Sequence, residues 1–159
     1  MADIKRILVP TDFSGPADAA LTYALGLASK LGAEVSVVHV FDDPSGIRSG
    51  EYVPVPAEMR GEILADLRRR LADVVAKHGD SQLTSQLLIG PTARSIVEGA
   101  RDSQADLIVM GTHGRHGMAH LLLGSVAERV VRTSICPVLT VRTPSVTGGE
   151  HTAPEQVAS

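Results

Sequence analysis

The second half of the chain contains a glycine pattern whose spacing suits anion binding. The apolar run Leu107–Met110 ends in Gly111 and Gly114, which are three residues apart. Nine residues further on, Gly124 and Ser125 open a segment with helical apolar spacing. Glycines let the backbone approach a phosphate closely, and the amides at a helix start carry partial positive charge toward it. The pattern therefore predicts a strand that leads into a phosphate-binding loop.

The same glycines also fit an ordinary helix start, where they act only as turn residues. No lysine lies within the glycine-rich segment, and the dinucleotide pattern G-x-G-x-x-G is absent. Phosphate binding would therefore rely on backbone amides, on the Ser125 hydroxyl and amide, and on a metal ion. We favour the phosphate loop because Gly124 and Ser125 accompany the first two glycines and because an acidic turn is expected to face them.

That acidic turn follows the first apolar run of the chain. Pro10, Thr11 and Asp12 come directly after it, and a helical pattern begins at Ser14. Aspartate at a turn also caps helices, so Asp12 is either a ligand-facing carboxylate or a capping residue near Ser14. In an open α/β sheet, ligands bind outside the carboxyl ends of the strands at a topological switch point. We favour the ligand-facing role for Asp12 because of the glycine pattern that is expected to lie beside it.

Histidines in the glycine-rich segment raise the alternative of a metal site. His113, His116 and His120 lie close in sequence, but no acidic residue or cysteine completes a ligand set around them. We expect instead that His113 and Arg115 flank the phosphates and add positive charge. On the second apolar run, His39 fits a hydrogen-bonded core histidine better than a catalytic one.

Apolar periodicity alternates between strand and helix along the chain. The expected strands are Ile4–Val9, Glu34–Val40, Leu83–Ile89, Leu107–Met110 and Pro137–Arg142. The expected helices are a segment from the N-cap Ser14 to the stop at Gly32, then Ala57–His78 (stopped by Gly79), Pro91–Ser103 and Leu121–Thr133. Three prolines and two glycines predict a loop over Asp42–Pro56. The alternation β-α-β-α-β-α-β-α-β predicts an α/β protein with a doubly wound, five-stranded parallel sheet and helices on both faces.

Composition supports this fold class and disfavours several functions. Hydrophobic residues make up 43% of the 159 residues and aromatics only 3%, so the core must consist of Val, Leu, Ile and Ala. A formal net charge of -3 argues against a dedicated nucleic-acid binder. Cys136 is the single cysteine, which excludes an intramolecular disulfide and a cysteine zinc cluster.

The two ends of the chain carry little structural pattern. No signal-peptide core follows the N-terminus and no apolar run has the length of a membrane span, so we expect a cytoplasmic protein without membrane contact. Residues 143–159 lack a periodic apolar face and predict a disordered tail after a single domain at 1–142.

The consecutive cations Arg68, Arg69 and Arg70 fit a solvated helix face that also covers the rim of the core.

The pattern G-x-x-G-x9-G-[ST], set between a strand and a helix, resembles the nucleotide-binding signature of the universal stress protein family. Four further segments up to Arg142 carry the same resemblance in order, namely Ile7–Ser14, Val38–Val40, Ala105–Gly111 and Cys136–Leu139. The resemblance implies a Rossmann-like domain with strand order 3-2-1-4-5, which places the first and fourth strands side by side. The chain matches the ATP-binding type of the family at every glycine.

The resemblance also implies a role for each matching residue. Pro10 and Thr11 would line the adenine pocket, and the backbone of Val40 would meet the adenine edge. Asp12 would contact the ribose or a nucleotide-bound Mg²⁺. The full set that the resemblance places at the nucleotide is Pro10, Thr11, Asp12, Val40, Met110, Gly111, Gly114, Gly124, Ser125 and Val126.

These expectations amount to a nucleotide-dependent stress-response regulator without robust catalysis. Bound ATP, or another adenine nucleotide, would set the conformation of the 42–56 or 113–120 segment for a protein partner to read. A slow Mg²⁺-dependent ATPase, a cyclic-nucleotide binder and a nucleotide-free interaction domain stay open as alternatives. The last strand, Pro137–Arg142, would lie at a sheet edge, and the family resemblance implies that it pairs in a homodimer.

Overall fold

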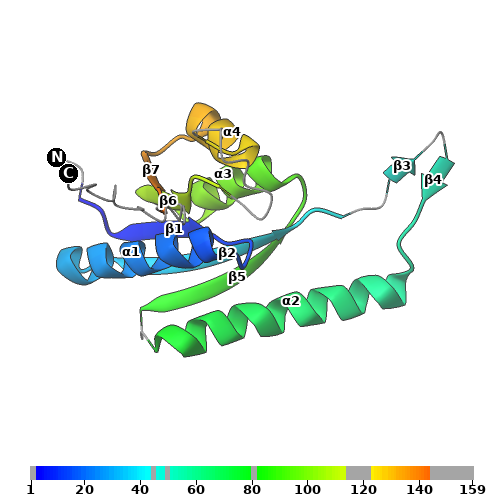
Figure 1. The fold of residues 1–159 in the computed structure, drawn as a ribbon, viewed down its shortest axis with the longest axis horizontal. Helices are drawn as coiled ribbons and strands as arrows, with labels where there is room; N and C mark the ends of the chain where they lie inside the picture. The colour runs from blue at the N-terminus through cyan, green and yellow to red at the C-terminus, as the bar shows by residue number, and fades with distance from the viewer. Residues whose placement is uncertain (1–2, 44–45, 49–50, 80–81, 114–122, 144–159) are drawn as a thin grey trace, which may run out of the picture.

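The computed structural model describes residues 3–43, 46–48, 51–79, 82–113 and 123–143. Within them lie a five-stranded parallel sheet, a two-stranded hairpin and four α-helices (Figure 1). The sheet consists of β1 (Arg6–Pro10), β2 (Glu34–Phe41), β5 (Leu83–Ile89), β6 (Leu107–Gly111) and β7 (Val138–Val141). The hairpin consists of β3 (Gly46–Arg48) and β4 (Glu51–Val53), and the helices are α1 (Gly15–Leu31), α2 (Ala57–His78), α3 (Thr92–Asp102) and α4 (Ser125–Thr133).

The strand order of the large sheet is β5-β2-β1-β6-β7, and all of its pairings are parallel. Counted within this sheet alone, the order is the expected 3-2-1-4-5, so the doubly wound α/β class is confirmed. The chain builds outward from β1 through β2 to β5, then returns to the other side of β1 to add β6 and β7. This reversal places a topological switch point between β1 and β6.

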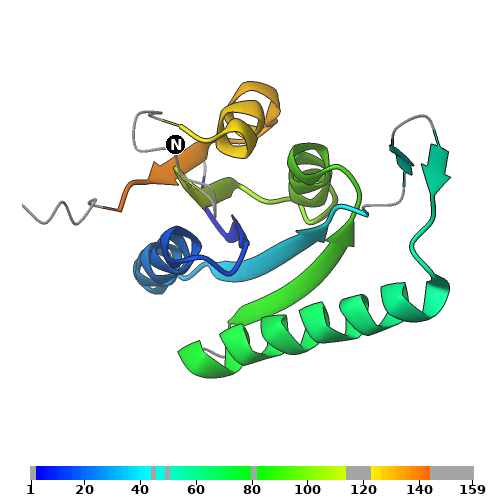
Figure 2. The ribbon, with the colours of Figure 1, turned by 45° about the vertical axis from the view of Figure 1, so that its right-hand side comes forward.

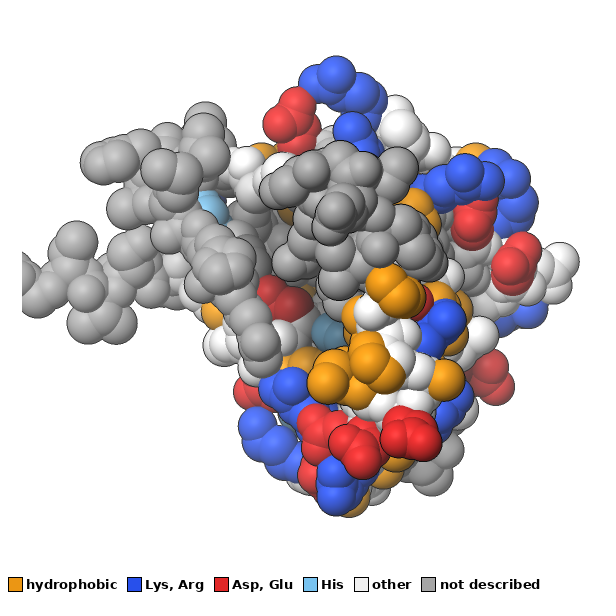
Figure 3. Space-filling view, turned by 90° about the vertical axis from the view of Figure 1, so that its right-hand side faces the viewer, with side chains coloured by type: hydrophobic (Ala, Val, Ile, Leu, Met, Phe, Trp, Pro, Cys, Tyr) orange, Lys and Arg blue, Asp and Glu red, His pale blue; other side chains and the backbone are white. Residues whose placement is uncertain are grey.

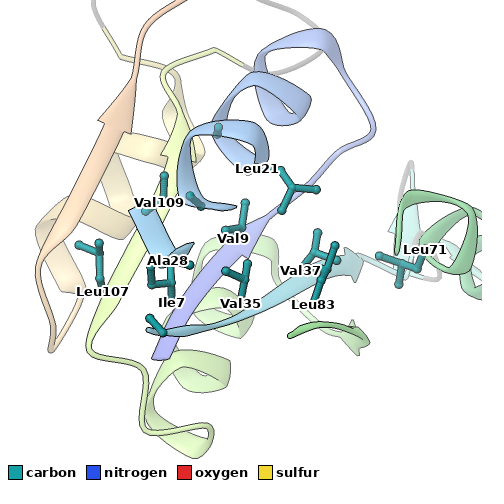
Figure 4. Close-up of a cluster of buried hydrophobic side chains, with 13 residues drawn as sticks. Ile7, Val9, Leu21, Ala28, Val35, Val37, Leu71, Leu83, Leu107 and Val109 are labelled. Atoms are coloured by element: carbon teal, nitrogen blue, oxygen red, sulfur yellow. The ribbon is translucent and has the colours of Figure 1, made fainter. Parts of the chain in front are cut away.

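Helices cover both faces of the sheet, with α1 and α2 on one face and α3 and α4 on the other (Figure 2). Strand side chains alternate between the two faces. On β1, Ile7 and Val9 belong to the same buried cluster as Leu21 of α1 and Leu71 of α2 (Figure 4). Leu8, between them in sequence, packs toward α3 and α4. Both faces of β1 are therefore buried, as expected of a strand inside a parallel sheet.

Local capping residues set the ends of the helices at the predicted places. The Ser14 hydroxyl accepts the Ala17 N–H, which caps α1, and Pro16 lies in the first turn. Gly32 and Gly79 follow α1 and α2 in the left-handed conformation, with φ of 66° and 59°. Of the described residues, no helix is both long enough and apolar enough to cross a membrane.

An aspartate clamps the amino ends of β1 and β6 together. Asp106 Oδ2 accepts the backbone N–H groups of Lys5 and Arg6, both at 2.9 Å, and the Asp106 N–H donates to the Arg6 carbonyl at 2.8 Å. The two N–H bonds stabilise the carboxylate and hold the Asp106 pKa below its usual range. Because these bonds fix the register of β1 against β6, they also fix how the loops at the opposite ends of the two strands face each other.

Three expectations about element bounds need correction. The segment Asp42–Pro56 is not all loop, since β3 and β4 pair as an antiparallel hairpin inside it. The first strand begins at Arg6 rather than Ile4, although the Lys5 carbonyl already accepts the Glu34 N–H. The last helix begins at Ser125 rather than Leu121, because Gly124 has extended backbone (φ -68°, ψ 159°) and serves as its N-cap. The expected tail at 144–159 lies outside the described residues.

Close packing of α1 on β6 explains one glycine of the sequence pattern. A Cβ added to Gly111 would lie 3.0 Å from the Pro16 carbonyl oxygen and 3.1 Å from its carbonyl carbon. These are backbone atoms of the first turn of α1, which cannot move without shifting the helix. Gly111 therefore has a packing role that does not depend on any ligand.

We predict that Gly111→Ala and Gly99→Ala have different effects on stability. Gly111→Ala forces α1 away from β6 and should lower the free energy of unfolding by about 1–3 kcal/mol. A Cβ on Gly99 meets only the tip of the Leu88 side chain at 2.9 Å, which can rotate away. Alanine is also favoured over glycine within a helix by about 1 kcal/mol, so Gly99→Ala should leave stability nearly unchanged. Urea unfolding followed by circular dichroism tests this, and equal losses in both variants would contradict it.

Candidate functional site

The candidate site lies where β1 and β6 end. These strands pair in parallel, with Ile7 opposite Leu107 and Leu8 opposite Ile108, so the chain leaves both at the same edge of the sheet. β2 ends beside β1 on the other side. Figure 3, which faces this end of the sheet, shows an acidic and a histidine side chain close together near the centre of the view. The fold thus brings together the acidic turn and the glycine pattern, which lie about a hundred residues apart in sequence.

The turn after β1 is held by hydrogen bonds between neighbours. The Thr11 N–H donates to the Val38 carbonyl at 2.8 Å, and Thr11 Oγ1 accepts the Phe13 N–H at 3.0 Å. Asp12 Oδ1 accepts both the Ser14 N–H, at 3.0 Å, and the Ser14 hydroxyl. Ser14 is therefore the helix cap, and Asp12 orients it from two residues before. Asp12 has a structural role in the turn while its side chain stays half-buried at the strand end.

Phe13 connects this turn to β2 and α2. Phe13 has a φ of 63°, a conformation that non-glycine residues rarely adopt. Its ring lies 4.6 Å from the His39 ring, centroid to centroid, and the Arg70 guanidinium carbon lies 4.1 Å from the Phe13 centroid. His39 Nδ1 is 2.7 Å from the Thr11 carbonyl oxygen, so this nitrogen is the donor. His39 is hydrogen-bonded, as predicted, but it is half-buried rather than part of the core. Arg70 is half-buried and stacked on Phe13.

The start of α4 is tied to the end of β6 by the backbone. The Gly124 N–H donates to the Thr112 carbonyl at 2.7 Å, and the Thr112 N–H donates to the Val141 carbonyl at 3.1 Å. A Cβ on Gly124 would lie 3.2 Å from the Thr112 oxygen, so this approach favours glycine. The bond between Gly124 and Thr112 therefore sets the first turn of α4 at the carboxyl end of β6.

The first turn of α4 offers backbone donors toward this end of the sheet. Gly124 has no side chain to cap the helix, and the first intrahelical bond is from the Glu128 N–H to the Gly124 carbonyl at 2.8 Å. The N–H groups of Ser125, Val126 and Ala127 precede that bond and have no helical acceptor. Three amides at a helix start, with the Ser125 hydroxyl beside them, form a suitable arrangement for a phosphate group.

The remaining predicted residues take different places around the strand ends. Val40 and Met110 are 9% and 5% exposed and pack in the core under α3 and α4, so only their backbone groups are available to a ligand. Thr11 is 9% exposed and Pro10 is half-buried. His113 is half-buried, with Nδ1 2.9 Å from Thr112 Oγ1. Gly114 and Arg115 lie outside the described residues, as do His116 and His120.

A metal site is not formed by the described side chains alone. Within 3–43, 46–48, 51–79, 82–113 and 123–143, no three His, Cys, Asp or Glu side chains converge on a point that could hold a metal ion.

Phe13 and Arg70 were not identified as site residues from the sequence. They are 57 residues apart in sequence. An arginine on a helix gives no local signal that its side chain stacks on a ring from a distant part of the chain. Thr112, which ties β6 to both α4 and β7, was missed for a similar reason, because its role is carried by backbone groups. The aromatic residue within Pro10–Ser14 was the only available hint, since the chain has just two phenylalanines.

Comparisons with known proteins agree with this geometry. The family model described as the universal stress protein family matches residues 3–142. Universal stress protein MJ0531 of Methanocaldococcus jannaschii is 36% identical over 147 residues, which cover 88% of this chain and 83% of that protein.

Solved structures show the same similarity at the level of the fold. The structure of MJ0577, a universal stress protein of M. jannaschii, has a TM-score of 0.75 at 27% identity and covers 90% of this chain and 99% of that one. A universal stress protein solved in complex with cAMP has a TM-score of 0.64 at 25% identity, covering 90% of this chain and 100% of that one. One from Archaeoglobus fulgidus, in complex with dAMP, has a TM-score of 0.59 at 26% identity, covering 87% and 98%. With its sheet order, its glycine pattern and a family match over nearly the whole described chain, this protein belongs to the universal stress protein family.

Proposed function

We propose that this protein binds an adenine nucleotide at the carboxyl ends of β1, β2 and β6 and acts as a nucleotide-dependent regulator. The observation that carries the proposal is the Gly124–Thr112 hydrogen bond of 2.7 Å, because it sets the open amides of α4 at the end of β6. β6 pairs with β1, which Asp12 follows in sequence. The complexes of two similar proteins with cAMP and dAMP support the choice of ligand. Both ligands contain an adenine, a sugar and one phosphate.

In this proposal each part of the nucleotide meets a different strand end. The adenine lies by Pro10, Thr11 and the backbone of Val40, with Met110 packed behind. The sugar lies by Asp12, which can also share a Mg²⁺ ion with the phosphates. The phosphates lie against the glycine segment and the first turn of α4, with contacts from Gly111, His113, Gly114, Arg115, Gly124, Ser125 and Val126.

A regulatory role fits better than an enzymatic one. The sequence offers a phosphate site without a lysine in the glycine segment and without a Ser-His-Asp set. At most we expect weak Mg²⁺-dependent ATP hydrolysis. In this proposal the segment 42–56, which contains the β3–β4 hairpin and follows β2, reports nucleotide binding to a protein partner in the cytoplasm. Cyclic-nucleotide binding is the second candidate, and the cAMP complex of a similar protein favours it.

The direct test is to identify the small molecule that the protein carries. Freshly purified protein should release an adenine nucleotide, close to one per chain, when it is denatured, and mass spectrometry would identify it. Binding of added Mg-ATP and of cAMP, measured by calorimetry on emptied protein, completes the test. Protein that carries no nucleotide and takes up neither ligand would refute the proposal and leave an interaction domain as the better account.

We predict that Ser125→Pro lowers nucleotide affinity without unfolding α4. Ser125 is the first helical residue, where proline is tolerated, and the extended backbone of Gly124 suits a residue that precedes proline. The variant loses one amide N–H and one hydroxyl that would bind a charged phosphate. A hydrogen bond to a charged group contributes about 1.5–3 kcal/mol, so affinity for ATP should fall on the order of tenfold or more.

Two matched variants separate this effect from a loss of structure. Ser125→Ala removes only the hydroxyl and should lower affinity less than Ser125→Pro. Thr92→Pro places proline at the same helical position of α3 and should leave affinity unchanged. If Ser125→Pro lowers the affinity for ATP more than the affinity for cAMP, the α4 amides bind the outer phosphates of ATP. Unchanged affinity for both ligands in Ser125→Pro would contradict phosphate binding at this helix.

We also propose that the protein forms a homodimer through β7, the short strand at one edge of the sheet. Val141 and Pro137 carbonyls accept bonds from β6, so the backbone groups of Thr140 face away from the sheet. Thr140→Pro removes one outward N–H and should shift the protein toward monomer in size-exclusion chromatography with light scattering. A variant that stays dimeric, or a wild type that is monomeric, would contradict pairing through β7.

A further inference from the structure

The opposite edge of the sheet, strand β5, lacks the features that protect edge strands. β5 pairs only with β2 among the described strands, and it is seven residues long, against four for β7. Its sequence, Leu-Thr-Ser-Gln-Leu-Leu-Ile, contains no charge and no proline. Thr84, Ser85, Gln86 and Ile89 are exposed. Natural proteins usually shorten, charge or interrupt such an edge, because its unpaired backbone groups are a template for another strand.

Hydrogen-bond parity shows which backbone groups of β5 face outward. The Gln82 carbonyl accepts the Val35 N–H at 3.1 Å, and the Gly90 N–H donates to the Phe41 carbonyl at 3.0 Å. The backbone N–H and C=O groups of the even-numbered residues therefore face β2. In a parallel strand, both backbone groups of one residue point to the same side, and the side alternates from residue to residue. The outward set is Leu83, Ser85, Leu87 and Ile89. These groups form a continuous pairing edge.

A groove of 350 Å³ runs beside this edge, between β5 and α3. Gln86, Leu88 and Ile89 line it from the strand, and α3 lines it with the residues Ser95, Glu98, Gly99, Asp102 and Ser103. The groove sits on the α3 face of the sheet. A strand added next to β5 would direct every second side chain toward this face, so those side chains would lie over the groove.

The charges of the groove select the kind of side chain that fits. Glu98 and Asp102 lie one helical turn apart on α3 and are the charged residues among its lining. Arg94 donates to Glu98 Oε1 at 2.7 Å, but Asp102 forms no ion pair with a described residue. An added strand with a lysine or arginine over the groove would place a cation near both carboxylates.

Ser95 of α3 adds a hydroxyl to the lining of the groove. A polar group of an incoming strand can form a hydrogen bond with this hydroxyl, which both donates and accepts.

We propose that the β5 edge and this groove bind an extended segment of a partner protein, which adds to the sheet as a further strand. The segment carries lysine or arginine at alternate positions, over Glu98 and Asp102, and β-branched or other apolar residues between them. Backbone pairing to the outward groups supplies affinity, and the groove supplies specificity. This site is separate from the nucleotide site and does not depend on nucleotide binding.

The test uses full-length protein and the peptide acetyl-Thr-Lys-Val-Lys-Val-Lys-Thr-amide, followed by amide hydrogen exchange with NMR detection. In the free protein, the Ser85, Leu87 and Ile89 amides should exchange fast, and those of Thr84, Gln86 and Leu88 slowly. The peptide should protect the first set and leave the second unchanged. A peptide with glutamate in place of lysine should bind at least about fivefold more weakly, because like charges would face each other.

Variants of the edge and of the groove provide independent checks. Ser85→Pro removes an outward N–H and no bond to β2, so it should abolish peptide protection, whereas Ser85→Ala should not. The double variant Glu98→Gln, Asp102→Asn should bind the lysine peptide about fivefold more weakly than the wild type. The control pair Asp66→Asn and Glu128→Gln removes the same amount of charge elsewhere and should have no effect. Both control carboxylates accept a hydrogen bond from an arginine at 2.7 Å, as Glu98 does.

Three results would overturn the proposal. The first is peptide binding without protection of the outward amides. The second is equal binding of the lysine and glutamate peptides. The third is protection of the outward amides in the free protein that grows with its concentration, because the edge would then pair with a second copy of the chain.

Discussion

The parallel pairing of β1 with β6 is the constraint on which the rest of this structure depends. It joins two strands that are separated in the chain by α1, β2, α2, β5 and α3, and it creates the switch point at which both strand ends open to one side. Asp106 fixes its register from the far end through bonds to Lys5 and Arg6. Without this pairing, neither the acidic turn nor the glycine segment would have a partner across the site.

Several residues to which we assign a binding role also have a packing or capping role in the structure. Gly111 belongs to the glycine pattern, yet the approach of Pro16 already requires it. We propose that Asp12 faces the nucleotide, and in the structure it orients the Ser14 cap. Phe13, held in an unusual conformation between His39 and Arg70, links the turn to β2 and α2. A change at any of these positions acts on the fold and on the site, so stability and affinity need to be measured separately.

The fold leaves two sheet edges, and they differ in ways that suggest different uses. β7 is short, and we propose that it pairs with a second copy of the chain. β5 is longer and uncharged, and it lies beside a groove with two carboxylates. An edge of this kind favours a basic, extended segment over a second identical strand, since the chain's own β5 carries no cation. One sheet could then hold a nucleotide at its carboxyl end and two protein contacts at its edges.

The sequence by itself determined the local structure and the chemistry that the residues can offer. Ser14, Gly32 and Gly79 predicted helix ends correctly because capping depends on neighbours within a few residues. Strand and helix periods predicted the fold class, but the sheet order came only with the family resemblance, since periodicity does not say which strands pair. Tertiary structure alone decided the stacking of Arg70 on Phe13, the closure of Gly124 on Thr112, and the outward face of β5. These features join residues distant in sequence, and only the packed sheet brings such residues into contact.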